Sequence, residues 1–166
     1  RDVTLNAVNG IGANGALSLN AVALTAITDN GDIRLDQTGT VALNTVRTGN
    51  GEIAVAVHDG DAGARGDSQL LADATLGNIR ADGDVSLSAV DGGLINDNDD
   101  TNYVGGDSVT LASADGIGAG GAIDTRANRI DASVSGDGNI DIAERDGLAG
   151  LDASAANGNV KVSTAT

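Results

Sequence analysis

The stretch Asn30-Gly31-Asp32-Ile33-Arg34-Leu35 contains the pattern that decides the fold: a turn dipeptide, one further polar residue, and then an apolar, polar, apolar alternation. Four further copies begin at Asn50, Asp82, Asp137 and Asn157. In every copy the fourth and sixth residues are aliphatic, which is typical of a strand with one buried face. The glycine at the second position favours the positive φ of a tight turn. We therefore expect each copy to form a corner followed by a short strand.

The copies recur at two fixed intervals. Those that begin at 30 and 50 are 20 residues apart, as are those that begin at 137 and 157, and the first pair precedes the second by 107 residues. A period of about 20 residues is the size of one coil of a solenoid. The longer interval indicates a duplication, with related copies over 2–57 and 108–164 and a partial copy over 82–95. We predict an all-β, single-stranded parallel β-helix over residues 1–166, forming one repeat segment of a longer fibrous protein.

Composition supports an elongated array over a compact globule. The chain has one aromatic residue, Tyr103, and no Trp, Phe, Met, Pro or Cys, whereas its 25 glycines disfavour helices of useful length. Compact cores normally use large aromatic side chains. A narrow interior of stacked Val, Ile, Leu and Ala needs none of them, because similar side chains from successive coils lie about 4.8 Å apart.

The charge excludes several classes of partner. The formal net charge is −15, so nucleic acid and anionic membrane surfaces would be repelled and cations attracted. No apolar run approaches the roughly 18 residues that a membrane-spanning helix requires, so we expect no membrane insertion. The absence of cysteine means only that disulfides play no part in stability.

The repeats resemble a known family. Asp2-Val3-Thr4-Leu5 and Gly10-Ile11-Gly12 recur as Ser108-Val109-Thr110-Leu111 and Gly116-Ile117-Gly118, and this wording is similar to the repeat region of filamentous-haemagglutinin-like large exoproteins. The resemblance implies a right-handed parallel β-helix at the bacterial cell surface or in the extracellular space. It also implies a shaft or adhesive stalk without catalysis, whose partner is a host or neighbouring-cell surface or matrix component, including carbohydrate. The Asn-Pro-Asn signature of the family's secretion domain is missing, so the resemblance is to the shaft.

Two stretches satisfy the dinucleotide-binding pattern G-x-G-x-x-G, at 10–15 and at 116–121. That motif ends a strand and opens a helix whose N-terminus holds a pyrophosphate. No helical periodicity follows either stretch, so we interpret both as glycine-rich corners of the solenoid and expect no cofactor.

The acidic stretch around Asp97, Asp99 and Asp100 is a weak candidate for Ca²⁺, because hard oxygen ligands suit that ion. An EF-hand would need glycine where Asn102 stands and glutamate where Ser108 stands. A solvated acidic loop without a metal is therefore the favoured interpretation.

Arg65, Gly66 and Asp67 spell the tripeptide that integrins recognise, within a polar stretch over 58–69 that we expect to project from a corner. These residues are a candidate cell-attachment site, although chance produces this tripeptide easily in a chain rich in glycine and aspartate. His58 has no second histidine or cysteine with which to hold a metal, and we expect it at a solvated strand end.

An alternative function is that of a β-helical protein that binds or degrades polysaccharide. Asp141 with Asp131 or Glu144 could supply the paired carboxylates of such an enzyme. The shortage of aromatic residues argues against this, because carbohydrate clefts use aromatic platforms. We also expect end-to-end self-association, since core patterns at Val3 and Val160 leave unpaired strand edges at both ends.

Overall fold

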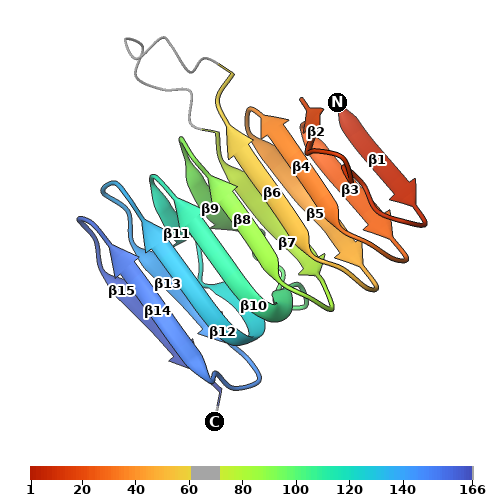
Figure 1. The fold of residues 1–166 in the computed structure, drawn as a ribbon. Helices are drawn as coiled ribbons and strands as arrows, with labels where there is room; N and C mark the ends of the chain where they lie inside the picture. Colours follow the sequence, from red (N-terminus) through yellow and green to blue (C-terminus); the bar gives the residue numbers. More distant parts are fainter. Residues whose placement is uncertain (61–71, 166) are drawn as a thin grey trace.

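The computed structural model describes residues 1–60 and 72–165 as a β-solenoid of about 7 turns, with parallel strands in stacked coils of about 21 residues (Figure 1). This confirms the predicted fold class, and the described residues contain no helix. The strands are β1 (Asp2–Ala7), β2 (Leu17–Leu19), β3 (Ala23–Thr28), β4 (Ile33–Thr38), β5 (Val41–Thr48), β6 (Ile53–His58), β7 (Ala74–Arg80), β8 (Val85–Ala89), β9 (Gly93–Asn96), β10 (Val104–Ser113), β11 (Gly116–Ala119), β12 (Ile123–Val134), β13 (Ile140–Glu144), β14 (Gly150–Ala155) and β15 (Val160–Thr164).

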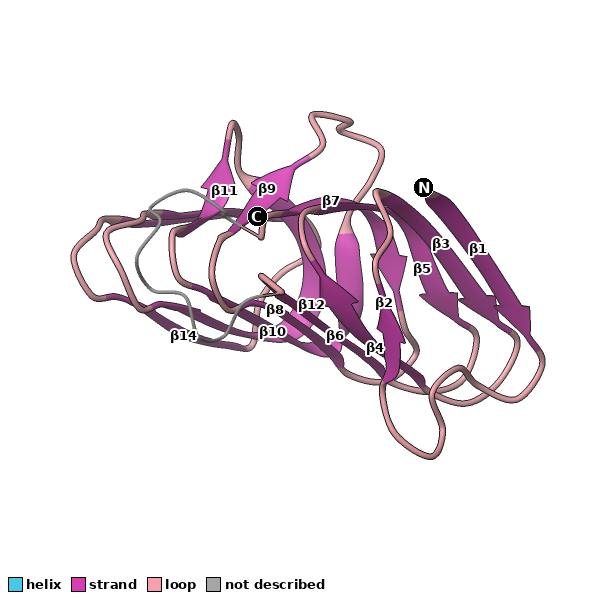
Figure 2. Ribbon diagram, turned by 90° about the horizontal axis from the view of Figure 1, so that it is seen from above, coloured by secondary structure: helices cyan, strands magenta, loops and turns pink. Residues whose placement is uncertain are grey.

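The strands form one continuous sheet that folds into two facing layers along the solenoid, which we call the first and the second sheet (Figure 2). The first sheet contains β1, β3, β5, β7, β9, β11, β13, β15 and the beginnings of β10 and β12. The second contains β2, β4, β6, β8, β14 and the ends of β10 and β12. The long strands β10 and β12 therefore bend from one sheet into the other, and each coil contributes once to each sheet.

The core is a stack of small aliphatic side chains between the two sheets. In the second sheet, Ile33, Ile53, Val85, Val109 and Ile130 are register partners on five successive coils. Each has at most 1% of its surface exposed. Full burial of such a side chain contributes about 1.5–3 kcal/mol. The alternation of buried and exposed residues that the sequence predicted is thus present on every coil of this stack.

The short interval is one coil, but the long interval is not a whole number of coils. Ile33 pairs with Ile53, and Ile140 with Val160, as the 20-residue spacing requires. Val3, in contrast, lies in the first sheet, whereas its counterpart Val109 pairs with Val85 in the second. The two copies of the duplication therefore occupy opposite sheets, so the structural unit that repeats is half a coil.

Close stacking, more often than backbone conformation, explains the glycines of the corners. Of the five glycines in the repeated pattern, only Gly31 has a positive φ, of 79°. The prediction of positive φ at the other four was wrong. A Cβ on Gly138 would clash with the carbonyl oxygen of Asp115, and a Cβ on Gly158 would clash with that of Gly138. Glycine is needed there because neighbouring coils approach too closely to admit a side chain.

In several copies the polar residue after the glycine joins neighbouring coils. The Asp32 Oδ1 accepts a hydrogen bond of 3.1 Å from the Glu52 backbone N–H one coil further on. In the second copy, the Asn139 Oδ1 accepts one of 2.8 Å from the Asn159 backbone N–H. A hydrogen bond of this kind contributes about 1 kcal/mol, and here it also satisfies a backbone donor at a corner.

The two terminal coils expose side chains of the type that is buried elsewhere. Leu17 in β2 is 39% exposed, Leu151 in β14 is 47% exposed and Val160 in β15 is 44% exposed. The strands β1, β2, β14 and β15 each pair on one side only within the described structure. Both ends of this segment therefore present unpaired backbone groups and apolar surface.

Candidate functional site

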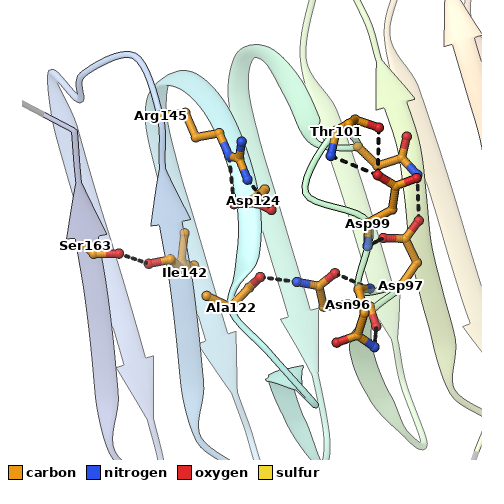
Figure 3. Close-up of polar contacts among 11 residues, drawn as sticks. Asn96, Asp97, Asp99, Thr101, Ala122, Asp124, Ile142, Arg145 and Ser163 are labelled. Carbon is orange, nitrogen blue, oxygen red and sulfur yellow. Dashed lines mark hydrogen bonds and ion pairs between the residues drawn. The ribbon is translucent and has the colours of Figure 1, made fainter.

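The acidic loop between β9 and β10 uses its carboxylates to close its own turns (Figure 3). Asp97 accepts hydrogen bonds from the Asp99 N–H, at 3.1 Å, and from Asn102 Nδ2, at 2.7 Å. Asp99 accepts from the N–H and the Oγ1 of Thr101, at 2.9 and 2.7 Å. These bonds from Thr101 lower the pKa of Asp99. Asp100 is exposed, and nowhere in the described chain do three or more acidic or histidine side chains gather as a metal site would require.

The candidate cell-attachment residues Arg65, Gly66 and Asp67 lie outside the described residues. His58, at the end of β6, is placed: its Nε2 is 2.8 Å from Asp36 Oδ1 in β4, and its Nδ1 is 2.8 Å from the Asp59 carbonyl oxygen. The bond to that carbonyl, followed by the charge of Asp36, raises the pKa of His58. His58 thus links two coils, and this contact needs no metal.

The two glycine-rich stretches are insertions relative to the strand on the next coil, and within the described residues no helix follows either. Ile11 pairs with Ile33, and pairing resumes at Leu17 with Leu35. Ile117 pairs with Ile140, and pairing resumes at Ile123 with Ile142. Gly12 has a φ of 75° and Gly118 a φ of 85°. The interpretation of both stretches as solenoid corners was therefore wrong for most of their length, because each lies opposite the interior of a strand on the next coil. Neither offers the helix N-terminus that a pyrophosphate would need.

The carboxylates considered for glycoside chemistry are kept apart. Asp131 lies in the second sheet, paired with Asp152, whereas Asp141 lies in the first sheet. Asp141 points outward and forms an ion pair of 2.9 Å with Lys161 on the next coil. Glu144, on the same strand as Asp141, points inward and is 2% exposed. The two acids of either pair therefore cannot act on one substrate.

Glu144 belongs to the interior of the solenoid. Its Oε2 accepts a hydrogen bond of 2.7 Å from Thr125 Oγ1, and its Oε1 accepts one of 3.0 Å from the Asp146 N–H. Burial raises the pKa of the Glu144 carboxyl. The Glu144 carboxyl therefore links β12 and β13 inside the solenoid, and its contacts are structural.

The site that sequence reasoning missed is a cleft at the corner where the first sheet turns into the second. Three arginines line it, and we call Arg47, Arg80 and Arg126 the arginine row. The cleft, which we call the arginine cleft, has a volume of about 440 Å³. Register aligns the row along the solenoid: Arg47 pairs with Arg80, and Gly105 lies between Arg80 and Arg126. Cationic side chains therefore occupy equivalent positions on three coils of a strongly acidic protein.

Tyr103 occupies the space that Gly105 leaves in this row. A Cβ on Gly105 would come within 2.7 Å of the Tyr103 ring. The guanidinium carbon of Arg80 lies 3.9 Å from the ring centroid, and that of Arg126 lies 4.5 Å from it. Because register places Arg80 and Arg126 on either side of Gly105, the only aromatic ring of the chain separates the two cations and attracts both.

A signal for the arginine row does exist in the sequence. Arg47 directly follows the core residue Val46, and Arg80 directly follows the core residue Ile79. Each arginine is therefore the first outward residue after the last core residue of its strand. The signal was overlooked because Arg126 lies within the long strand β12, where no turn dipeptide marks the corner.

Arg145 has an ion-pair partner, whereas the arginines of the row have none among the described residues. It makes a two-point ion pair with Asp124, at 2.7 and 2.8 Å (Figure 3). Arg34 and Lys161 are also paired with aspartates. Over residues 1–60 and 72–165, Arg47, Arg80 and Arg126 make no ion pair within 4.0 Å.

The described part of the chain contains no helix long and apolar enough to cross a bilayer. No family model, curated protein or solved structure matches this chain.

Proposed function

We propose that this chain is part of the structural shaft, or adhesive stalk, of a secreted or surface-anchored bacterial adhesin and that it has no catalytic activity. The observation that supports this is the continuous coil-to-coil register. Five aliphatic residues stack in one line through the second sheet, and corner side chains such as Asp32 and Asn139 bond each coil to the next. Such a scaffold resists bending because every coil is held by its neighbours.

The test of the shaft function is a measurement of length and stiffness. The chain contains no cysteine, so Thr4→Cys in β1 and Ser163→Cys in β15 allow two spin labels to be attached at opposite ends of the first sheet. With about 7 turns and a spacing of about 4.8 Å per coil, the labels should be roughly 30–35 Å apart. A shaft requires a narrow distance distribution. A broad distribution would show a flexible chain that cannot serve as a spacer.

Catalysis is tested separately, with acidic and neutral polysaccharides as substrates. The expected result is intact polysaccharide after prolonged incubation. New reducing ends or unsaturated products would support the alternative, a polysaccharide-degrading β-helix. Binding of polysaccharide without degradation is compatible with an adhesive stalk, and the arginine cleft is the feature that favours it.

A further inference from the structure

The arginine row holds three like charges that make no ion pair with any described carboxylate. Arg47 and Arg80 are register partners on adjacent coils, about 4.8 Å apart along the solenoid axis, and Arg126 is about two coil spacings beyond Arg80. Surface cations this close repel one another unless an anion lies between them. Tyr103 relieves the repulsion between Arg80 and Arg126 but has no contact of this kind with Arg47.

The row is also partly desolvated. The Nε of Arg80 is buried and has no hydrogen-bond partner among the described residues. A buried donor without a partner costs about 1–3 kcal/mol, more for a charged group, and a bound acceptor would remove that cost. The Tyr103 ring restricts the Arg80 and Arg126 guanidinium groups, and side chains that are already ordered lose less entropy when a ligand binds.

The remaining lining of the cleft shows that a bare polyanion is not its best ligand. Asp82, Asp107 and Asp146 line the same cleft as the arginine row. Their carboxylates accept hydrogen bonds but repel anions, whereas guanidinium groups donate two parallel hydrogen bonds to a carboxylate. A ligand that fits both sets of groups carries, on each of its units, one anionic group for the arginines and several hydroxyl donors for the aspartates.

We propose that the arginine cleft binds a carboxylated sugar unit of an acidic polysaccharide. The uronate carboxylate lies against Arg47 and its neighbours in the row, and ring hydroxyls donate to Asp82 and Asp107. The volume of about 440 Å³ is within the usual range for small-molecule sites, about 300–1,000 Å³. Successive sugar units extend along the solenoid axis. This inference rests on the adhesive part of the proposed function and deepens it.

The test is a calorimetric titration of the whole 166-residue chain with tri-galacturonate, at low and at near-physiological salt. The matched neutral probe is the fully methyl-esterified trisaccharide, which has the same rings and hydroxyls without the carboxylates. We expect tri-galacturonate to bind and the ester to bind at least about tenfold more weakly, because each charge-assisted hydrogen bond contributes about 1.5–3 kcal/mol.

Two substitutions locate the binding in the cleft. Arg47 is exposed and unpaired, so Arg47→Gln should leave folding intact and weaken tri-galacturonate binding about tenfold. Arg129→Gln removes the same charge from an exposed position on β12 that does not line the cleft, and it should leave the affinity unchanged. An equal loss in both variants would mean that only the overall charge matters, and would overturn the proposal.

A third variant separates a sugar site from a plain anion site. Asp107→Ala removes a hydroxyl acceptor, so binding of tri-galacturonate should weaken about threefold to tenfold. If the aspartate merely repels anions, the same change would tighten binding of both tri-galacturonate and dextran sulfate, and the proposal would be wrong. Absence of any tri-galacturonate binding would also overturn it. Neither result would affect the spin-label distances that test the shaft.

Discussion

Replacing one leucine in an interior coil and one in a terminal coil measures how strongly the stack holds the solenoid together. Leu111 in β10 has no exposed surface and lies between its register partners Leu87 and Ala132. Leu151 in β14 is 47% exposed and pairs only with Ile130. Both lie in the second sheet, so replacing each by alanine removes the same side-chain atoms from a fully buried site and from a half-exposed site.

The expected free energies of unfolding differ severalfold. Leu111→Ala removes a fully buried side chain and leaves a cavity between two coils, which costs about 3–5 kcal/mol. Leu151→Ala loses about half of the transfer free energy and leaves no enclosed cavity, which costs about 1 kcal/mol. The outward neighbour of Leu111 provides a control on the same strand, because Thr110→Ala should change the unfolding free energy by no more than about 0.5 kcal/mol.

The assay is urea unfolding followed by far-ultraviolet circular dichroism at low protein concentration. With a slope of about 2 kcal/mol per molar urea, the midpoint should fall by about 1.5–2.5 M for Leu111→Ala and by about 0.5 M for Leu151→Ala. Equal shifts would refute the reasoning, because they would mean that the two leucines are equally buried in solution. End-to-end association could also bury Leu151 and give equal shifts, but those shifts would then depend on protein concentration. Equal shifts at every protein concentration would refute the reasoning.

Four further outcomes are expected. Gly138→Ala should destabilise the chain by about 1–3 kcal/mol in the same urea assay, because the corner has no room for a Cβ. His58, whose pKa is raised in the folded state, should stabilise the chain most below its unfolded pKa of about 6.5, and its contribution of at most about 1 kcal/mol should disappear as the pH rises through the folded value. The pKa of Glu144 is also raised, so Glu144→Gln should raise the thermal midpoint at neutral pH and lose this advantage at pH values below about 4.5. Sedimentation should show end-to-end association that strengthens with added salt, because salt screens the net charge of −15.

Each of these outcomes has a matched control. Gly150→Ala places a methyl group against the flexible Arg129 side chain and should be tolerated, so equal losses at Gly138 and Gly150 would contradict the stacking argument. His58→Gln should abolish the pH-dependent stabilisation, and an unchanged pH profile would mean that another group causes it. A pH-independent effect of Glu144→Gln would show that the pKa of Glu144 is the same in the folded and unfolded states. A monomer at all salt concentrations would show that the coil ends do not associate.

The fold could be predicted from the sequence because one local pattern carries nearly all the information. Two aliphatic residues on either side of a polar one specify a buried face, and the 20-residue spacing of Ile33 and Ile53 specifies the coil. The role of the corner glycines could not be predicted in the same way. Whether Gly138 needs a positive φ or merely lacks room depends on how closely the neighbouring coil approaches, which is a property of the stacked structure.

Individual arginines of the cleft carry a sequence signal, but their grouping into one cleft could not be predicted, for a related reason. Arg47, Arg80 and Arg126 are separated by 33 and 46 residues in the sequence and meet only because insertions of different lengths lie between their strands. A register predicted by counting 20 residues per coil is wrong wherever such an insertion lengthens a coil. The position of Tyr103 over Gly105 follows from a loop that returns to the sheet, and no periodic pattern encodes that return.

The half-coil repeat determines the directions in which this rod can display its loops. The stretches 12–16 and 118–122 correspond in sequence, yet the first interrupts the second sheet and the second interrupts the first sheet. Figure 2 accordingly shows the chain next to β2 and the chain next to β11 projecting to opposite sides. A duplication that spans an odd number of half-coils places the copied loop on the opposite side of the rod. A duplication that spans whole coils places it on the same side as the original. A lineage of such proteins can therefore present one loop to two different surroundings without changing a residue in it.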